Sequence, residues 1–374
     1  MGRTCNRCPP SHSRRMFLAA SGLSLLGTSA LAQERGADDC PQCGGVGLVP
    51  IPDAKPFVWV DGQPAPKPEA AVGEQHCPVC RAGGDSAELV AAAKGRFERA
   101  QSKHAEWKER IGGRLVLVMT RHAALTTQFT FAQAKSAGQA VESLTLHLKR
   151  VSRSLALVPT RLGEYEQILL WERSAWDAFR KVMEELYTPM QLGDAWSLSK
   201  GFNSYDHVVT PHLYESPQTI RQRPLTHGPV FLAARRQVHL ATRWKAPIWL
   251  AEGFAAYGDH AVHKANRWWS VYDPGKTPAV GDWLADARRL TKAGSVQPWD
   301  KLLRRELRDW EPDDYYQTLG IVAFLLEAEP GKFLALLRKL AAGDDQVAAL
   351  EDAYRQPLAE LDRRASTWLV ARRS

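Results

Sequence analysis

Apolar and polar residues alternate with helical spacing in two neighbouring segments near the middle of the chain. In the first, residues 228–243, the apolar positions recur three and four residues apart and leave a polar face, which is typical of an amphipathic helix. The Lys-Ala-Pro sequence at residues 245–247 ends this helix, because proline lacks an amide hydrogen and disfavours the helical conformation of the residue before it. A second helix is predicted over residues 248–262, where Glu252 lies among large apolar side chains. The pattern therefore predicts two consecutive helices joined by a short turn.

The rest of the chain divides into a mixed part before this helix pair and a helical part after it. Short apolar runs predict strands at residues 56–60, 114–120, 168–171, 195–198 and 207–210. Helical periodicity predicts helices at residues 85–111, 139–157, 172–186, 301–308, 313–326, 333–340, 347–354 and 358–370. This order indicates an α+β fold, in which a small mixed β-sheet is followed by a mainly helical subdomain.

The sequence PIWLAEGFAAY at residues 247–257 resembles the third-ligand helix of gluzincin metallopeptidases, in particular the peptidase-MA-like domains of bacterial exported proteins. In that family the preceding helix carries H-E-x-x-H. Its two histidines share one helix face and bind zinc, and the glutamate between them acts as general base. The glutamate of the second helix is the third protein ligand. The resemblance covers residues 114–370, about two-thirds of the chain, and implies a gluzincin-like domain over residues 114–374.

Laid on the family pattern, the vestigial site of this chain has two arginines where zinc chemistry needs a histidine and a glutamate. Arg235 stands at the first ligand position and Arg236 at the position of the base, whereas His239 and Glu252 match the other two ligands. A guanidinium stays protonated and cannot bind zinc, so we expect the catalytic zinc to be absent. We also expect Arg235 to pair with Glu252 in place of the metal. The resemblance further implies that Tyr316, or its neighbour Tyr315, faces the metal position.

With these two arginines, the resemblance implies an exported pseudo-metallopeptidase that acts as a binding or scaffolding module, with no catalytic residue assigned. The family resemblance implies an extended peptide or protein as the partner in the cleft, held along an edge strand by main-chain hydrogen bonds. An alternative is an active metal-dependent hydrolase with rearranged ligands: His239, Glu252 and one residue from 259–263. A third possibility is an adaptor whose C-terminal domain only supplies a surface.

Four cysteines form two C-x-x-C pairs separated by 33 residues: Cys40, Cys43, Cys77 and Cys80. This spacing is typical of a structural zinc site with four thiolate ligands, and it predicts a zinc-ribbon-like module over residues 33–84. Two disulfides are the alternative, because exported cysteines usually oxidise. The amphipathic segment 85–113 is expected to link this module to the following domain as a rigid helical arm.

Residues 1–32 have the features of an export signal. Ser13 to Leu18 (SRRMFL) resembles a twin-arginine motif, a small apolar stretch follows, and Ala-Leu-Ala at residues 30–32 precedes a candidate cleavage site. The apolar stretch is shorter than the ~20 residues that span a bilayer, so no stable membrane span is expected after signal removal. We therefore expect a periplasmic or extracellular protein.

Composition adds little to this picture beyond a folded globular chain. The chain has 374 residues, of which 44% are hydrophobic and 24% charged, enough apolar material for a full core. Its formal charge is +8, but residues 1–32 contribute four arginines and no acid, so the mature chain is near +4. This modest charge gives no reason to expect a nucleic-acid partner.

Overall fold

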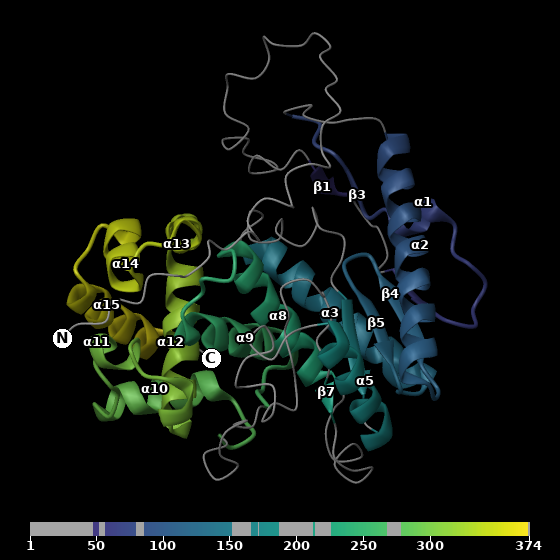
Figure 1. Cartoon of the computed structure of the whole chain (residues 1–374). Helices are drawn as coiled ribbons and strands as arrows, with labels where there is room; N and C mark the ends of the chain where they lie inside the picture. Colours follow the sequence, from purple (N-terminus) through teal and green to yellow (C-terminus); the bar gives the residue numbers. More distant parts are fainter. Residues whose placement is uncertain are drawn as a thin grey trace, which may run out of the picture.

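The computed structural model describes residues 48–51, 57–79, 86–151, 166–170, 172–186, 212–213, 226–267 and 278–372. The expected export signal, Cys40, Cys43, Cys80 and the expected strand pair at residues 195–198 and 207–210 lie outside these ranges. In the described part, a β-sheet with its covering helices lies on one side and a group of helices on the other (Figure 1). The α+β class is therefore confirmed.

A five-stranded sheet forms the first of these two parts. Its order is β2-β4-β5-β6-β7, and the strands are β2 (Val58–Val60), β4 (Val116–Thr120), β5 (Ala124–Thr127), β6 (Glu166–Leu170) and β7 (His212–Leu213). The β2–β4 and β4–β5 pairs are antiparallel, whereas β5–β6 and β6–β7 are parallel. The sheet is thus mixed, as predicted. Strands β5 and β7 were not predicted, because four and two residues are too short for a clear period.

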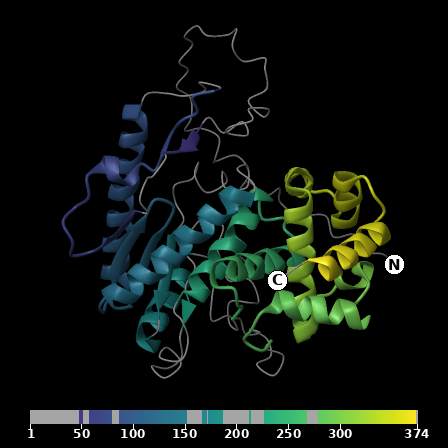
Figure 2. The ribbon, with the colours of Figure 1, turned by 180° about the vertical axis from the view of Figure 1, so that it is seen from behind.

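Helices cover both faces of the sheet (Figures 1 and 2). Val116 and Val118 of β4 pack in the same cluster as α3 (Phe131–Val151), while Leu117 and Met119 pack with α2 (Ser86–Ile111). Because both faces are buried, this strand is a continuous apolar run rather than an alternating one. α5 (Arg173–Leu186) packs beside α2. α2 thus covers one face of the sheet, and the expected division of the chain into modules joined by residues 85–113 stays a prediction.

α3 begins eight residues before the predicted start at residue 139. Thr130 and Gln133 form two reciprocal hydrogen bonds at its beginning. The backbone N–H of Gln133 donates to Thr130 Oγ1, and the backbone N–H of Thr130 donates to Gln133 Oε1. This is the capping box, which satisfies amide groups that have no partner within the helix. The sequence signal for this capping box is Thr-Phe-Ala-Gln at residues 130–133, which lies before the apolar repeat from which the helix was predicted.

The segment between the cysteine pairs contributes to two different sheets. β1 (Leu48–Pro50) pairs with β3 (Glu74–His76) in a small antiparallel ladder. β2, which lies between them in sequence, pairs instead with β4 of the main sheet, and α1 (Pro68–Ala71) follows it. Lys149 of α3 forms an ion pair with Glu74 of β3. The boundary expected at residue 84 therefore lies between β2 and β4, two strands that pair within the main sheet.

The second part is helical. It contains α8 (His227–Ala241), α9 (Ile248–His263), α10 (Trp283–Ala293), α11 (Trp299–Leu302), the short 3-10 helix η5 (Leu307–Asp309), α12 (Pro312–Ala328), α13 (Pro330–Ala342), α14 (Gln346–Tyr354) and α15 (Leu358–Ala371). α8 and α9 lie between the sheet and the remaining helices (Figure 1) and share one apolar cluster with both. No helix in the described ranges combines the length and apolarity needed to cross a membrane.

Two segments of this helical part differ from the prediction. α10 was not predicted, although Asp282 caps it by accepting a hydrogen bond from the Ala285 amide and Gly294 ends it with φ 67°. The helix expected over residues 301–308 is instead the short α11 followed by η5. Neither stretch has a long apolar period, so local capping and tertiary packing decide their structure.

Candidate functional site

α8 and α9 form an antiparallel hairpin, with helix bounds close to the two predicted segments. The connection is tight: Arg243 and Trp244 both have left-handed backbone angles, with φ 52° and 64°. Residues other than glycine rarely adopt this conformation, so the surrounding packing holds it in place. Pro247 then precedes the first turn of α9. This turn sets the middle of α8 against the first half of α9, and the beginning of α8 against the end of α9.

Arg235 and Glu252 meet across the hairpin. Arg235 Nη2 lies 3.0 Å from Glu252 Oε1, and the side chain of Glu252 is only 1% exposed while that of Arg235 is 24% exposed. The predicted pairing is therefore confirmed. Their N–H and carboxylate directions are not aligned for a hydrogen bond, and neither Glu252 oxygen has a hydrogen-bond donor among the described residues. The contact is therefore an ion pair without the two parallel hydrogen bonds of a bidentate arginine–carboxylate interaction.

Burial dominates the electrostatics of Glu252. Removal from water raises the pKa of this carboxyl, and the positive charge of Arg235 opposes that rise without cancelling it. A buried carboxylate costs free energy unless a cation lies beside it. Arg235 is thus the group that makes a charged Glu252 tolerable in the core.

His239 and Arg236 pack on the turn rather than on Glu252. The His239 ring stacks on the Trp244 ring at a centroid distance of 5.0 Å, and the Arg236 guanidinium lies 5.7 Å from the Trp244 ring centroid. Burial, followed by the charges of Arg235 and Arg236, lowers the pKa of His239 to about 3. At neutral pH this imidazole is therefore uncharged, and its Nδ1 is buried without a hydrogen-bond partner in the described part.

These residues do not fit a catalytic zinc ion. The guanidinium of Arg235 lies 3.0 Å from the Glu252 carboxylate, and a zinc ion bound to the same carboxylate would have to share its position with that charge. Arg236, at the position where the resemblance leads us to expect the general base, is 1% exposed and carries no proton-accepting group. No step of a zinc-peptidase reaction can be assigned to this set.

Tyr315 and Tyr316 lie in an aromatic cluster of the helical part. The Tyr316 ring packs edge-on against Trp283 at 5.7 Å, and Tyr315 packs against Trp310 at 4.9 Å. Both tyrosines are buried, and burial raises the pKa of Tyr316. The contacts assign these tyrosines to packing against α10 and its neighbours.

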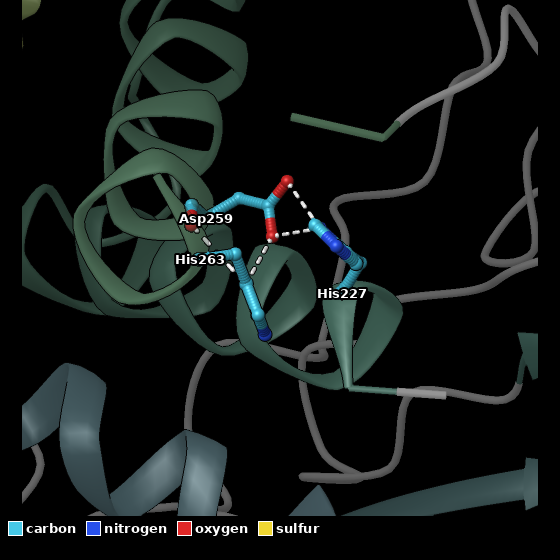
Figure 3. A group of neighbouring side chains, drawn as sticks. All are labelled: His227, Asp259 and His263. Carbon is cyan, nitrogen blue, oxygen red and sulfur yellow. Dashed lines mark hydrogen bonds and ion pairs between the residues drawn. The ribbon is translucent and has the colours of Figure 1, made fainter. Parts of the chain in front are cut away.

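The rearranged ligand set expected from His239, Glu252 and residues 259–263 is not assembled. On one helix, Glu252 and Asp259 are seven residues apart, which places them about 10 Å apart along the axis. Asp259 and His263 instead meet His227, and these three are the only group in the described residues whose metal-ligating atoms all lie within 4.8 Å (Figure 3). His227 was not among the predicted residues. Its only sequence signal was its place at the start of the first helix, opposite the end of the second.

Of the four cysteines predicted to bind zinc, the structure describes only Cys77. Cys77 is buried, with 1% of its surface exposed, just after β3. Cys40, Cys43 and Cys80 lie outside the described residues, so the four-cysteine zinc site stays a prediction.

Comparisons of the chain with protein-family models, with curated proteins and with solved structures found no match.

Proposed function

We propose that this chain is an exported, non-catalytic relative of gluzincin metallopeptidases that acts as a binding or scaffolding module. The observation that carries the proposal is the Arg235–Glu252 pair, in which a fixed cation stands beside the buried acid. A protein that keeps this acid for zinc catalysis has no reason to place a guanidinium beside it. A protein that only retains the scaffold needs such a cation, because the acid is buried.

The arrangement of elements supports the family part of the proposal. A small mixed sheet precedes the helix pair, and a mainly helical region follows it in the described part of the chain. The W-x-x-E-G sequence lies on α9, directly after the tight turn from α8. The expected location outside the cytoplasm and the four-cysteine zinc ribbon belong to the same proposal and rest on the sequence alone.

The proposed partner is an extended peptide or protein segment. Such a segment pairs with the open edge of a sheet through main-chain hydrogen bonds, which need no particular side chain on the partner. The main sheet ends at β2 on one side and at β7 on the other in the described part. No nucleic-acid partner is proposed.

Rebuilding the missing ligand tests the proposal directly. Arg235→His would place three family-type ligands at positions 235, 239 and 252, and adding Arg236→Glu would restore the base. We expect the single and the double variant each to bind one more zinc ion per chain than the wild type, measured by elemental analysis after dialysis. Arg235→Ala is the matched control, because it removes the cation without adding a ligand, and it should bind no additional zinc.

The same preparations give the activity test. We expect the wild-type protein to leave labelled unfolded casein intact, with or without added Zn²⁺, while binding it measurably by fluorescence anisotropy. Chelator-sensitive cleavage by the wild type that disappears in Glu252→Gln would show an active peptidase and overturn the non-catalytic assignment. If neither rebuilt variant gains zinc while both keep the wild-type circular dichroism spectrum, the family geometry is absent.

A further inference from the structure

A second group of charged and polar side chains lies at the other end of the α8–α9 hairpin. His227 is the first residue of α8, and Asp259 and His263 lie one turn apart near the end of α9. Figure 3 shows both imidazole rings directed at the Asp259 carboxylate, one from each helix. The side chains of His227, Asp259 and His263 are 8%, 0% and 15% exposed. The group is therefore almost completely removed from water.

The three side chains converge closely. His227 Nδ1 lies 2.8 Å from Asp259 Oδ1 and 3.0 Å from Oδ2, and His263 Nδ1 lies 2.9 Å from the same Oδ1. The two imidazole rings stack with their centroids 4.0 Å apart, so both Nδ1 atoms reach one carboxylate. Tetrahedral zinc bonds of about 2.0–2.2 Å place neighbouring ligand atoms about 3.3–3.6 Å apart. The nitrogen–oxygen distances of 2.8–3.0 Å are a few tenths of an ångström shorter, so a small outward shift of the side chains would admit an ion.

Outer contacts hold the group in this orientation. His263 Nε2 lies 2.9 Å from Thr226 Oγ1, and the Arg267 amide donates to Asp259 Oδ2 at 3.1 Å. A metal-binding histidine usually donates its other ring N–H to a fixed acceptor, which directs the free nitrogen toward the ion. The Thr226 hydroxyl is such an acceptor for His263. Asp259 is likewise held by a backbone amide on the side away from His263.

We propose that His227, Asp259 and His263 form a binding site for a divalent first-row transition metal ion. The ligands would be the two Nδ1 atoms and a carboxylate oxygen of Asp259. Two imidazoles and one carboxylate form a ligand set suited to Zn²⁺ and Fe²⁺, and three protein ligands leave positions open for solvent or a bound molecule. The ion replaces the protons that otherwise lie between each Nδ1 and the carboxylate.

This site is separate from the Arg235–Glu252 pair. Glu252 lies about two helical turns from Asp259 along α9, and the Arg235 charge is paired with Glu252 rather than with Asp259. The proposal therefore does not rest on the proposed function. A bound ion would join the first turn of α8 to the last turn of α9, across the end of the hairpin opposite its tight connection.

Zinc titration of the full mature chain tests the site, with Zn²⁺ alone as the probe. The comparison is between the wild type, His227→Gln and His263→Gln, with His260→Gln as the control. His260 lies on the same helix but is near Asp282, at 3.6 Å, and outside the group. Any zinc held by the cysteines is common to all four proteins and cancels in the comparison.

We expect both ligand variants to lose one zinc site by isothermal titration calorimetry, or to bind there more than 100-fold more weakly. Loss of an outer partner typically costs about 10–100-fold, so Thr226→Val should weaken the same site within that range. Added Zn²⁺ should raise the Tm of the wild type and of His260→Gln, but not that of His227→Gln or His263→Gln. Equal zinc stoichiometry and affinity in the wild type, His227→Gln and Thr226→Val would overturn the proposal and leave a hydrogen-bonded cluster.

Discussion

Replacing Arg235 by leucine is expected to lower the free energy of unfolding by about 3 kcal/mol at pH 7. The substitution keeps an apolar stem of similar length but removes the cation that pairs with Glu252 in the described part of the chain, where the Glu252 side chain is 1% exposed. Glu252 must then either remain charged in the core or take up a proton, and both cost free energy. Chemical denaturation monitored by tryptophan fluorescence measures the loss.

The pH dependence identifies the cause. Burial already raises the pKa of Glu252 in the folded protein, and removing Arg235 takes away the charge that lowers it. A carboxyl whose folded pKa exceeds its unfolded value binds more protons when folded, so its contribution to stability is present at low pH and is lost as pH rises. The destabilisation by Arg235→Leu should therefore be small at a pH low enough to protonate Glu252 in both folded proteins. It should grow as pH rises through the raised pKa of Glu252 in the folded wild type.

The double variant Arg235→Leu with Glu252→Gln is the control. The amide cannot ionise, so the pH-dependent part of the loss should disappear and most of the stability should return at pH 7. A single Arg235→Leu variant with the wild-type denaturation midpoint at pH 7 would show that the pair carries no stability. A loss that is the same at pH 4 and pH 8 would point to lost packing of the arginine stem instead.

Gly253→Ala is expected to destabilise the fold by about 2–3 kcal/mol. A Cβ at this position would lie 2.7 Å from the Thr318 backbone oxygen and 2.8 Å from Val322 Cγ2, so α9 and α12 would have to separate. The glycine follows Glu252 directly, and its lack of a side chain lets α12 pack against this part of α9. The family-like Glu-Gly pair thus has a packing reason in this chain that is independent of zinc.

Gly331→Ala is the matched control for this prediction. Gly331 also lies in a helix, but a Cβ there would meet no atom within 4 Å. Alanine has the higher helix propensity, so this variant should be neutral or more stable by up to about 1 kcal/mol. Thermal unfolding of the two variants measures the difference, and equal Tm values would show that the close approach of α12 at Gly253 has no energetic consequence.

The helix pair and its charge pair could be predicted because their signals are local and strong. The break before Pro247 and the apolar period on each side define two helices, and the position of Glu252 relative to Arg235 follows from their antiparallel packing. The long helix α2 was predicted within one residue at its start. Its packing against the sheet was not predicted, because an amphipathic period does not show which surface the apolar face of a helix will cover.

Other features depend on contacts that no local pattern contains. β5 is four residues long and is defined by its neighbours β4 and β6. β2 joins the main sheet although its sequence neighbours β1 and β3 pair with each other. His227 meets Asp259 because the turn at Arg243 and Trp244 folds α9 back along α8. Neither turn residue is a glycine, so the sequence contains no signal for their left-handed backbone angles. Tertiary packing decides these elements.

We propose that the Arg235 guanidinium occupies the place beside Glu252 where gluzincin metallopeptidases bind zinc. A crystal structure of the mature chain grown with Zn²⁺, with anomalous diffraction data collected at the zinc absorption edge, tests it most directly. We predict no anomalous peak within bonding distance of the Glu252 carboxylate or the His239 ring, and the Arg235 guanidinium in contact with that carboxylate. A zinc peak bonded to both His239 and Glu252, with Arg235 turned away, would show that this cation does not replace a metal.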